Sequence, residues 1–251
     1  TSEGEPDTSF SADGVRELPF GELHRLSPSY VTVDSQGRVL AAAMTNAPKG
    51  ENTRIVRLNP DGSSDDTFGS NGRATVNVDI TDWPDVLAVD ASDRVLLGLD
   101  FEQLSPGDAK YAGRSGVVRL RQNGGYDRKF SNDGLALFRL ASGGASYPMA
   151  LDVDGTGRVV VAAYDWVSTS YGAIRLLSSG VADTTYGHRG VVSAECRCSI
   201  YSADVHNGRV AFVANRGVEK ERQAVVARIG VDGTQVQLGE IDLVAGDDFE
   251  F

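Results

Sequence analysis

One stretch recurs along the chain and decides its fold: Val33-Asp34-Ser35-Gln36-Gly37-Arg38-Val39-Leu40-Ala41-Ala42. Each copy joins an apolar run to a second apolar run through a short polar turn that ends in arginine. The other copies lie at 89–98, 153–162 and 205–214, and the last of these has a turn one residue shorter. Repetition at a spacing of this kind is typical of folds built from equivalent units that stack on one another.

Two further segments recur in the same order. The first, Ile55–Gly62, contains an Arg-Leu pair and ends in a turn, and its copies lie at 117–124, 173–180 and 226–233. The second, Asp7–Gly14, has an aromatic residue in its fourth position, and its copies lie at 65–72, 127–134 and 183–190. The spacing gives four units of roughly 57 residues each.

Each unit has the pattern of short β-strands. Its apolar runs end in Asp, Asn and Gly, which favour tight hairpin turns, and no helical period persists. We expect four strands in the first unit, near 29–34, 38–45, 53–59 and 72–79. The matching strands are expected near 85–90, 94–100, 115–121 and 134–140, near 148–153, 158–165, 172–178 and 190–196, and near 200–205, 209–215 and 223–231.

Four-stranded antiparallel units of this size are typical of propeller blades. One such sheet cannot bury both of its faces alone, so the units pack side by side around an axis. The sequence therefore predicts an all-β fold, with a single β-propeller domain over residues 1–251. The expected blades lie at 21–80, 81–141, 142–197 and 198–244, with an additional N-terminal strand at 13–20.

The fourth unit lacks an obvious fourth strand, and two segments compete for that place. One is Val15–Phe20 near the N-terminus, and the other is Thr234–Val244 near the C-terminus. We expect the N-terminal segment to complete the blade, so that pairing of the two ends closes the ring. This arrangement would also explain why the first motif precedes the first complete unit.

The motifs carry a family resemblance, and it is tightest in Arg57-Leu58-Asn59-Pro60-Asp61-Gly62 and Asp66-Thr67-Phe68-Gly69. These strings resemble the delta-sixty repeat family of bacterial propeller-like proteins and, more distantly, the NHL repeat. The resemblance covers about 7–233 and fades in the fourth unit, where no aromatic motif follows Gly233. It implies a propeller in a periplasmic, secreted or cell-surface protein of bacteria. It implies no catalytic residues, and NHL-like propellers are mostly interaction platforms.

The composition excludes some partners. The net charge of −11 argues against nucleic acid, which needs a basic face for its phosphates, and against an anionic membrane surface. The longest apolar run, Val159–Tyr164, is far shorter than the roughly 18 residues that a membrane-spanning helix needs. We therefore expect no nucleic-acid partner and no membrane insertion. A protein or glycan ligand remains compatible with the charge.

No motif points to a cofactor or a metal. Asp152–Gly157 and Asn59–Ser63 look like pieces of calcium loops, but neither continues to the bidentate glutamate of an EF-hand. Cys196 and Cys198 lie two residues apart, at the upper limit of separation for a disulfide along an extended strand. A reduced pair and a bridge both fit this spacing, and we assign the pair a structural role. We expect neither a cofactor nor a metal site.

The charged and aromatic residues that repeat at equivalent places are expected to be structural, because a functional site is usually single. Side chains of Asp34, Asp90 and Asp154 should cap turns. The repeated arginines should pair with carboxylates or carbonyls between blades, and the repeated aromatic residues should fill the spaces between blades. These two sets are Arg57, Arg119, Arg175 and Arg228, and Phe10, Phe68, Phe130 and Tyr186.

The positions at which the units differ are the candidates for function. Trp83 and Tyr147 stand in the loops that enter the innermost strands, and the loops between the second and third strands should lie on the same face. Aromatic residues beside carboxylates can bind a sugar, a peptide or a cation. The expected binding face comprises Trp83, Asp85, Asp100, Tyr147, Asp165, Trp166 and Arg216, with no catalytic residue assigned. The long insertion Phe101–Arg114 lies beside it.

Three functions remain open from the sequence. The first is a non-catalytic binding or scaffold propeller that uses this face. The second is a hydrolase or lyase acting on a polysaccharide or small ester, with paired carboxylates among Asp85, Asp100 and Asp165 and with His24 as a base. The third is a spacer within a larger surface protein. The first agrees best with the absence of any catalytic motif.

Overall fold

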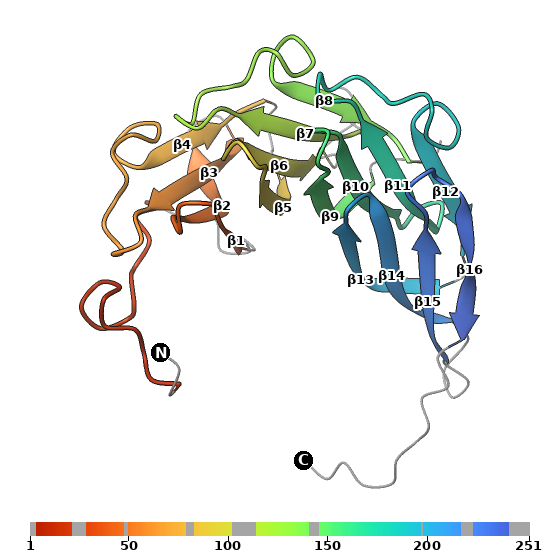
Figure 1. Ribbon diagram of the computed structural model, residues 1–251, viewed down its shortest axis with the longest axis horizontal. Helices are drawn as coiled ribbons and strands as arrows, with labels where there is room; N and C mark the ends of the chain where they lie inside the picture. Colours follow the sequence, from red (N-terminus) through yellow and green to blue (C-terminus); the bar gives the residue numbers. More distant parts are fainter. Residues whose placement is uncertain are drawn as a thin grey trace, which may run out of the picture.

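The computed structural model describes residues 4–21, 29–47, 50–78, 83–101, 114–140, 146–196, 198–216 and 223–240. These residues form sixteen strands in four antiparallel sheets (Figure 1). Blade 1 contains β1 (Ser29–Val33), β2 (Val39–Ala47), β3 (Gly50–Leu58) and β4 (Arg73–Val76). Blade 2 contains β5 (Trp83–Val89), β6 (Val95–Asp100), β7 (Ser115–Leu120) and β8 (Leu135–Phe138). Blade 3 contains β9 (Tyr147–Val153), β10 (Val159–Asp165), β11 (Ser170–Leu176) and β12 (Val191–Glu195). Blade 4 contains β13 (Cys198–His206), β14 (Arg209–Arg216), β15 (Gln223–Ile229) and β16 (Gln235–Glu240).

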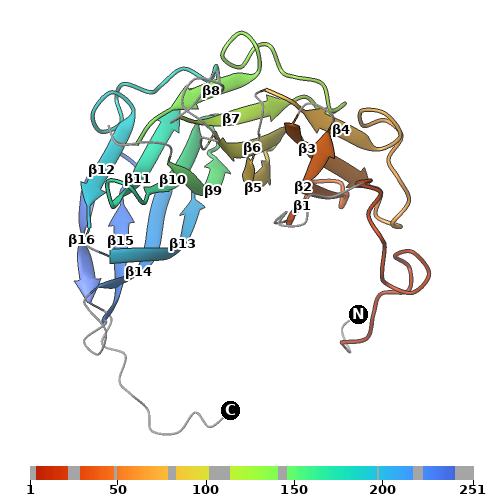
Figure 2. The ribbon, with the colours of Figure 1, turned by 180° about the vertical axis from the view of Figure 1, so that it is seen from behind.

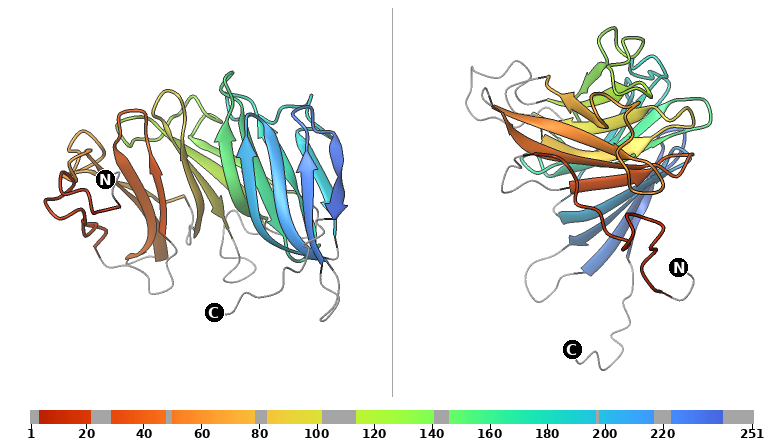
Figure 3. Two further views of the ribbon diagram at one scale, coloured as in Figure 1. Left: turned by 60° about the horizontal axis from the view of Figure 1, so that its bottom comes forward. Right: turned by 90° about the vertical axis from the view of Figure 1, so that its left-hand side faces the viewer.

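The strands of each blade pair in chain order, which is the four-stranded propeller blade that the repeats predict. The first strands of the blades, β1, β5, β9 and β13, line the inner side of the arc (Figure 1), and each lies beside the next. The view from behind shows the same order (Figure 2). The strands of all four blades run between the same two ends of the molecule (Figure 3, left). The fold is therefore all-β and propeller-like.

The described residues do not show the expected ring closure. Val15–Phe20 forms no strand, and β16 from the C-terminal segment completes blade 4. The arc stays open, with the N-terminal segment and blade 4 on opposite sides of the opening (Figure 1). The physical reason is packing: Phe20 is buried against Ala43 and Val56 on a face of blade 1 that no preceding blade covers. Arg54 Nη1 also donates a hydrogen bond to the carbonyl oxygen of Phe20.

The main hydrophobic core lies between neighbouring blades. Leu40 and Ile55 of blade 1 pack with Leu97 and Val118 of blade 2 in one buried cluster. All four side chains are 1% exposed or less, and burial of a side chain of this size stabilises the fold by about 1.5–3 kcal/mol. Equivalent clusters lie between blades 2 and 3 and between blades 3 and 4. The blades therefore position one another through their faces.

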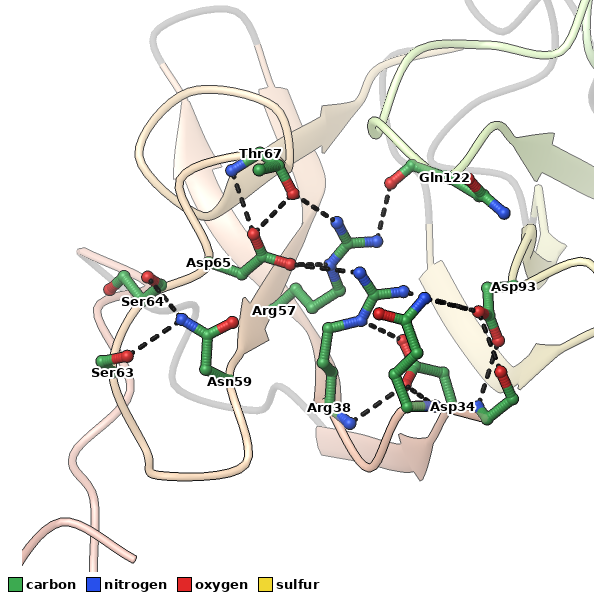
Figure 4. Close-up of polar contacts among 12 residues, drawn as sticks. Asp34, Arg38, Arg57, Asn59, Ser63, Ser64, Asp65, Thr67, Asp93 and Gln122 are labelled. Atoms are coloured by element: carbon green, nitrogen blue, oxygen red, sulfur yellow. Dashed lines mark hydrogen bonds and ion pairs between the residues drawn. The ribbon is translucent and has the colours of Figure 1, made fainter.

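In each of the first three blades, a buried arginine forms a hydrogen bond to the next blade. Arg57 Nε donates to Asp65 Oδ2 at 2.7 Å, and Arg57 Nη2 donates to Thr67 Oγ1 at 3.1 Å (Figure 4). Arg57 Nη1 donates to the carbonyl oxygen of Gln122 in blade 2 at 2.6 Å. The guanidinium carbon also lies 4.5 Å from the centroid of the Phe68 ring. We call this set of contacts the inter-blade arginine site.

The site repeats in blades 2 and 3. Arg119 binds Asp127, the carbonyl oxygen of Ser178 and the face of Phe130. Arg175 binds Asp183, Thr185, the carbonyl oxygen of Val231 and the face of Tyr186. The expectation of pairing between blades is confirmed for three arginines and was wrong for Arg228, which is exposed. Blade 4 lacks the Asp-x-x-Phe loop that would supply its partners, because Gly233 leads almost directly into β16.

The repeated aromatic rings lie between blades, as predicted, and each contacts a glycine of the following unit. A Cβ atom on Gly180 would lie 2.8 Å from the amide nitrogen of Ser131 and 3.0 Å from the ring of Phe130. The φ angle of Gly180 is also +83°, a conformation that side chains with a Cβ rarely adopt. Glycine is therefore required there for two independent reasons. The corresponding pairs are Phe10 with Gly62, Phe68 with Gly124, and Tyr186 with Gly233.

The turns that follow the inner strands are capped by their aspartates, which confirms the prediction. Asp154 Oδ1 accepts hydrogen bonds from the amides of Thr156 and Arg158, and Arg158 Nε donates to Asp154 Oδ2 at 2.7 Å. Burial acts to raise the pKa of Asp154, but these hydrogen bonds outweigh it and lower the pKa to about 2. Asp34 and Asp90 make the same contacts in their own turns.

A disulfide joins Cys196 and Cys198 between β12 and β13, where the chain passes from blade 3 to blade 4. Their Cα atoms are 5.1 Å apart, which is shorter than the spacing along a regular strand, and Cys196 lies outside β12, which ends at Glu195. Of the two states that the sequence left open, the structure shows the bridge. Within the described residues, no helix has the length and hydropathy needed to cross a membrane.

Candidate binding site at one end of the blades

The candidate residues from different blades lie at one end of the molecule. Trp83 and Tyr147 are the first residues of the inner strands β5 and β9. Asp100 and Asp165 are the last residues of β6 and β10, and Arg216 ends β14. Because neighbouring strands are antiparallel, the start of an inner strand and the end of the next strand share one end of the blade. Hairpin connectivity thus explains why residues distant in sequence lie at the same end of the blades.

Two carboxylates approach one tyrosine between blades 1 and 2. Trp83 lies directly opposite Asp100 in the β5–β6 register, and Asp100 is 2% exposed. Asp85 occupies an irregularity of β5, where the pairing shifts and a side chain can turn to a new direction. Burial raises the pKa of Tyr30 in β1 to about 12, and the charges of Asp85 and Asp100 add to this effect. We call Tyr30, Asp85 and Asp100 the tyrosine–carboxylate cluster.

A second pair of aromatic residues lies at the same end of blade 3. Tyr147 lies opposite Tyr164 in the β9–β10 register. The Tyr164 hydroxyl donates to the carbonyl oxygen of Cys198 at 3.4 Å and so links blade 3 to the first residue of blade 4. Burial raises the pKa of Tyr164, and the charge of Asp165 raises it further. The aromatic residues of blade 3 are therefore held in place by the neighbouring blade.

The loop after β10 presents apolar side chains to solvent. Asp165 is fully buried, and its Oδ1 atom accepts the amide of Val167 at 2.9 Å and the amide of Ser168 at 3.1 Å. These bonds fix the turn, and Trp166 and Val167 remain 55% and 57% exposed. The backbone that follows is also held, because the amide of Cys196 donates to the carbonyl oxygen of Thr169. The tip of this loop is thus an ordered apolar projection.

The structure does not bring all of the predicted residues together. Asp85 and Asp100 share Tyr30, whereas Asp165 belongs to blade 3 and is engaged in its own turn. Arg216 is exposed and forms no ion pair with another described residue. His24 and most of the insertion Phe101–Arg114 lie outside the described residues.

Tyr30 was missed by sequence reasoning. It stands in an ordinary strand pattern, Ser-Tyr-Val-Thr-Val, in which an aromatic residue is typical of a core position. A comparison between units could have found it. When the units are aligned on Val33, the position of Tyr30 is occupied by Val86 in the second unit and by Ala150 in the third. A polar aromatic residue among small apolar ones marks a difference between repeats.

The opposite end of the molecule carries two hollows that the sequence did not predict. One of about 420 Å³ is lined by Ser92, Arg94, Arg121, Gln122 and Asn123. The other, of about 470 Å³, shares Arg121 and is lined further by residues 126–129. Among the described residues, no three potential His, Cys, Asp or Glu ligands gather closely enough to hold a metal ion.

The fold and this site define the class of the protein as a β-propeller-like protein with aromatic and acidic residues at one end of its blades. A family model described as "Domain of unknown function (DUF5122) beta-propeller" matches residues 37–68, which run from the turn after β1 to Phe68. No curated protein matches the chain.

Solved structures resemble the chain at low identity. A protein of unknown function from Dyadobacter fermentans has a TM-score of 0.50 and 10% identity, over 85% of this chain and 65% of that one. An exo-β-1,3-galactanase from Phanerochaete chrysosporium gives 0.46 and 10%, over 88% of this chain and 50% of that one. Another from Clostridium thermocellum gives 0.45 and 11%, over 88% and 48%. The chain thus spans about half the length of the two galactanases, and at these identities the likeness concerns the fold alone.

Proposed function

We propose that the chain is a non-catalytic binding or interaction propeller of the bacterial envelope or exterior, and that it takes a glycan or protein ligand at the end of the blades that carries Trp166. The observation that supports this most is the ordered, exposed pair Trp166 and Val167. Large apolar side chains held in water by a fixed turn typically mark a recognition surface, because hydrophobic burial would otherwise favour covering them.

The chemistry around this loop suits a ligand with both apolar and polar faces. Trp166 offers a broad ring for stacking, as does Tyr147 at the start of β9. The tyrosine–carboxylate cluster provides hydrogen-bond acceptors and negative charge in neighbouring blades. A sugar, or a peptide that carries a cationic side chain, combines the features that such a surface binds. The net charge of −11 favours a neutral or cationic ligand further.

The disulfide supports the location outside the cytoplasm. Bridges such as Cys196–Cys198 form and persist in oxidising compartments, which include the periplasm and the cell exterior. The resemblance to delta-sixty repeat proteins implies the same location. Mass spectrometry of the protein isolated from its native compartment, with free thiols alkylated before lysis, should find both cysteines protected. Full alkylation of both would contradict this part of the proposal.

Intrinsic fluorescence offers a direct test, because the two tryptophans, Trp83 and Trp166, both lie at this end. The protein would be titrated with a panel of neutral oligosaccharides and with lysine-containing peptides while emission is recorded. We expect one probe class to shift the emission, and Trp166→Ala to weaken its binding about tenfold or more. Val181→Ala is the matched control, since Val181 is 58% exposed and lies at the other end of the blade. Equal affinity of the Trp166→Ala variant and the parent protein would refute the assignment.

The tyrosine–carboxylate cluster favours one alternative, a hydrolase or lyase acting on a polysaccharide or ester. Asp85 and Asp100 both lie near enough to Tyr30 for their charges to raise its pKa, and two neighbouring carboxylates could serve as an acid and an ionised partner. Such an activity would release reducing sugar or ester product from the panel, and Asp100→Asn would abolish it. Binding without turnover supports the non-catalytic function instead.

A further inference from the structure

The N-terminal segment builds an inter-blade arginine site that lacks its arginine. Asp7 Oδ1 accepts the amide of Ser9 at 3.0 Å and the hydroxyl of Ser9 at 2.6 Å. Asp65 Oδ1 accepts the same two groups from Thr67, and Asp65 Oδ2 then accepts Arg57 Nε. Among the described residues, no arginine reaches Asp7 Oδ2, although the carboxylate is arranged in the same way.

The other parts of the site are also in place. The amide of Ser11 donates to the carbonyl oxygen of Asp61 at 2.9 Å, just as the amide of Ser131 donates to that of Ser179. Phe10 is half-buried against Gly62, and no described guanidinium lies over its ring. In the complete sites, the arginine also donates to a carbonyl oxygen of the next blade, one residue before the carbonyl that accepts the loop amide. In the N-terminal site the corresponding residue is Pro60, directly before Asp61. A guanidinium would therefore meet a carboxylate, a hydroxyl, a carbonyl and an aromatic face.

Arg228 is the one repeated arginine without such a site. It is exposed on β15 and forms no ion pair with a described residue. It lies opposite Ala211 in the β14–β15 register, on the same face as Val213, which is 44% exposed. Arg228 lacks the carboxylate and the aromatic face that Asp7 and Phe10 offer. The strand β15 and the N-terminal segment lie on opposite sides of the opening in the arc (Figure 1).

The inner edge of blade 1 is uncovered on the side of the same opening. Val31 and Val33 of β1 are 68% and 56% exposed. Leu87 and Leu151, which occupy the place of Val31 in the next two blades, are 7% and 8% exposed because a preceding blade covers them. Blade 1 thus has the apolar surface that a preceding blade would bury.

We propose that a second copy of this chain closes the opening, with Arg228 of each copy bound at Asp7, Phe10 and Pro60 of the other. Charge complementarity and the uncovered faces of blades 1 and 4 both point to this occupant. A twofold axis makes the two contacts identical, so that two arcs of four blades give a ring of eight, within the usual range of about 4–8 blades. This assembly is independent of the ligand-binding function proposed above.

Sedimentation equilibrium over a range of concentrations tests the assembly. We expect a reversible dimer of twice 26.7 kDa, and Arg228→Glu should raise its dissociation constant at least tenfold. Arg139→Glu is the matched control, since Arg139 is exposed, carries the same charge and follows β8 in blade 2, away from the opening. Circular dichroism should show that both variants keep the parent fold. A monomer at every concentration, or a dimer that Arg228→Glu leaves unchanged, would overturn the proposal.

Exchanging the charges of Asp7 and Arg228 distinguishes a contact between two copies from ring closure within one chain. Asp7→Arg and Arg228→Asp should each yield monomers, and an equimolar mixture of the two variants should recover dimers, because one contact is native and the other has both charges reversed. Failure of the mixture to associate would contradict a contact between copies. The effects of Asp7 and Arg228 substitutions could instead be non-additive only in the unfolding free energy of a monomer. That result would show closure within one chain and would also overturn the proposal.

Discussion

Replacement of Arg119 by methionine is the sharpest test of the inter-blade arginine site. Arg119 has a side-chain exposure of 2%, and its Nε atom lies 2.9 Å from Asp127 Oδ2, while its Nη1 atom donates to the carbonyl oxygen of Ser178 at 2.9 Å. Methionine keeps most of the apolar stem that packs on Phe130 but leaves the buried Asp127 carboxylate with only the longer ion pair to Arg94 Nη1, at 3.6 Å.

The expected cost follows from the loss of the closer, hydrogen-bonded partner of this buried charge. Removal of one member of a buried ion pair typically costs about 3–5 kcal/mol, and the lost hydrogen bond to the next blade belongs to the same interaction. We therefore expect the free energy of unfolding of Arg119→Met to fall by about 4 kcal/mol at neutral pH. Arg228→Met is the matched control, because an exposed arginine without a partner should change it by no more than about 0.5 kcal/mol.

Urea denaturation followed by circular dichroism measures both values by linear extrapolation. The measurement should be made at concentrations where the protein is monomeric, so that association does not contribute to the stability of the parent. Equal losses in the two variants would refute the reasoning, and so would a loss below about 1 kcal/mol for Arg119→Met.

Three further changes test other parts of the structure. Asp154→Asn should lower the unfolding free energy at neutral pH. The difference should shrink as the pH falls below the unfolded-state pKa and should disappear below about 2, since a lowered pKa contributes its full stability above the unfolded-state pKa and loses it toward the folded-state pKa; urea titrations across pH measure this. Gly180→Ala should destabilise by about 1–3 kcal/mol in thermal unfolding because of its positive φ and close neighbours, whereas Gly155→Ala, with no atom within 4 Å, should not. The raised pKa of Tyr30 contributes stability below pH 10, and this stability should be lost as the pH rises to about 12. In alkaline unfolding curves, Tyr30→Phe should not show this loss.

The blades could be predicted because their signals are local and repeated. The turn after β1 needs only Asp34 and the residues that its carboxylate caps, and the same string marks the turn in blades 2 and 3. A role for Arg57 between blades could likewise be inferred, because a residue repeated at equivalent places is typical of a scaffold contact, and three of the four arginines form one. Local chemistry and repetition together were sufficient for the order of strands in each blade.

The ends of the chain could not be predicted in the same way. Two segments, Val15–Phe20 and Thr234–Val244, compete to complete blade 4, and the outcome depends on which arrangement buries more apolar surface. Phe20 is buried on blade 1, and no local sequence pattern reveals this position. The environment of Tyr30 depends on the neighbouring blade, since Asp85 and Asp100 approach it from blade 2. The face that carries the candidate site followed from hairpin connectivity, but the partners of each side chain needed the structure.

The most direct test of the repeated inter-blade contact is hydrogen exchange of arginine side chains by NMR. The Nε protons of Arg57, Arg119 and Arg175 are buried and hydrogen-bonded to aspartate in three successive blades, whereas Arg228 is exposed. Signals assigned by single Arg→Lys variants should show three slowly exchanging Nε protons at these positions and fast exchange at Arg228 in the monomer. Fast exchange at any of the first three, or protection at Arg228 in the monomer, would contradict the account.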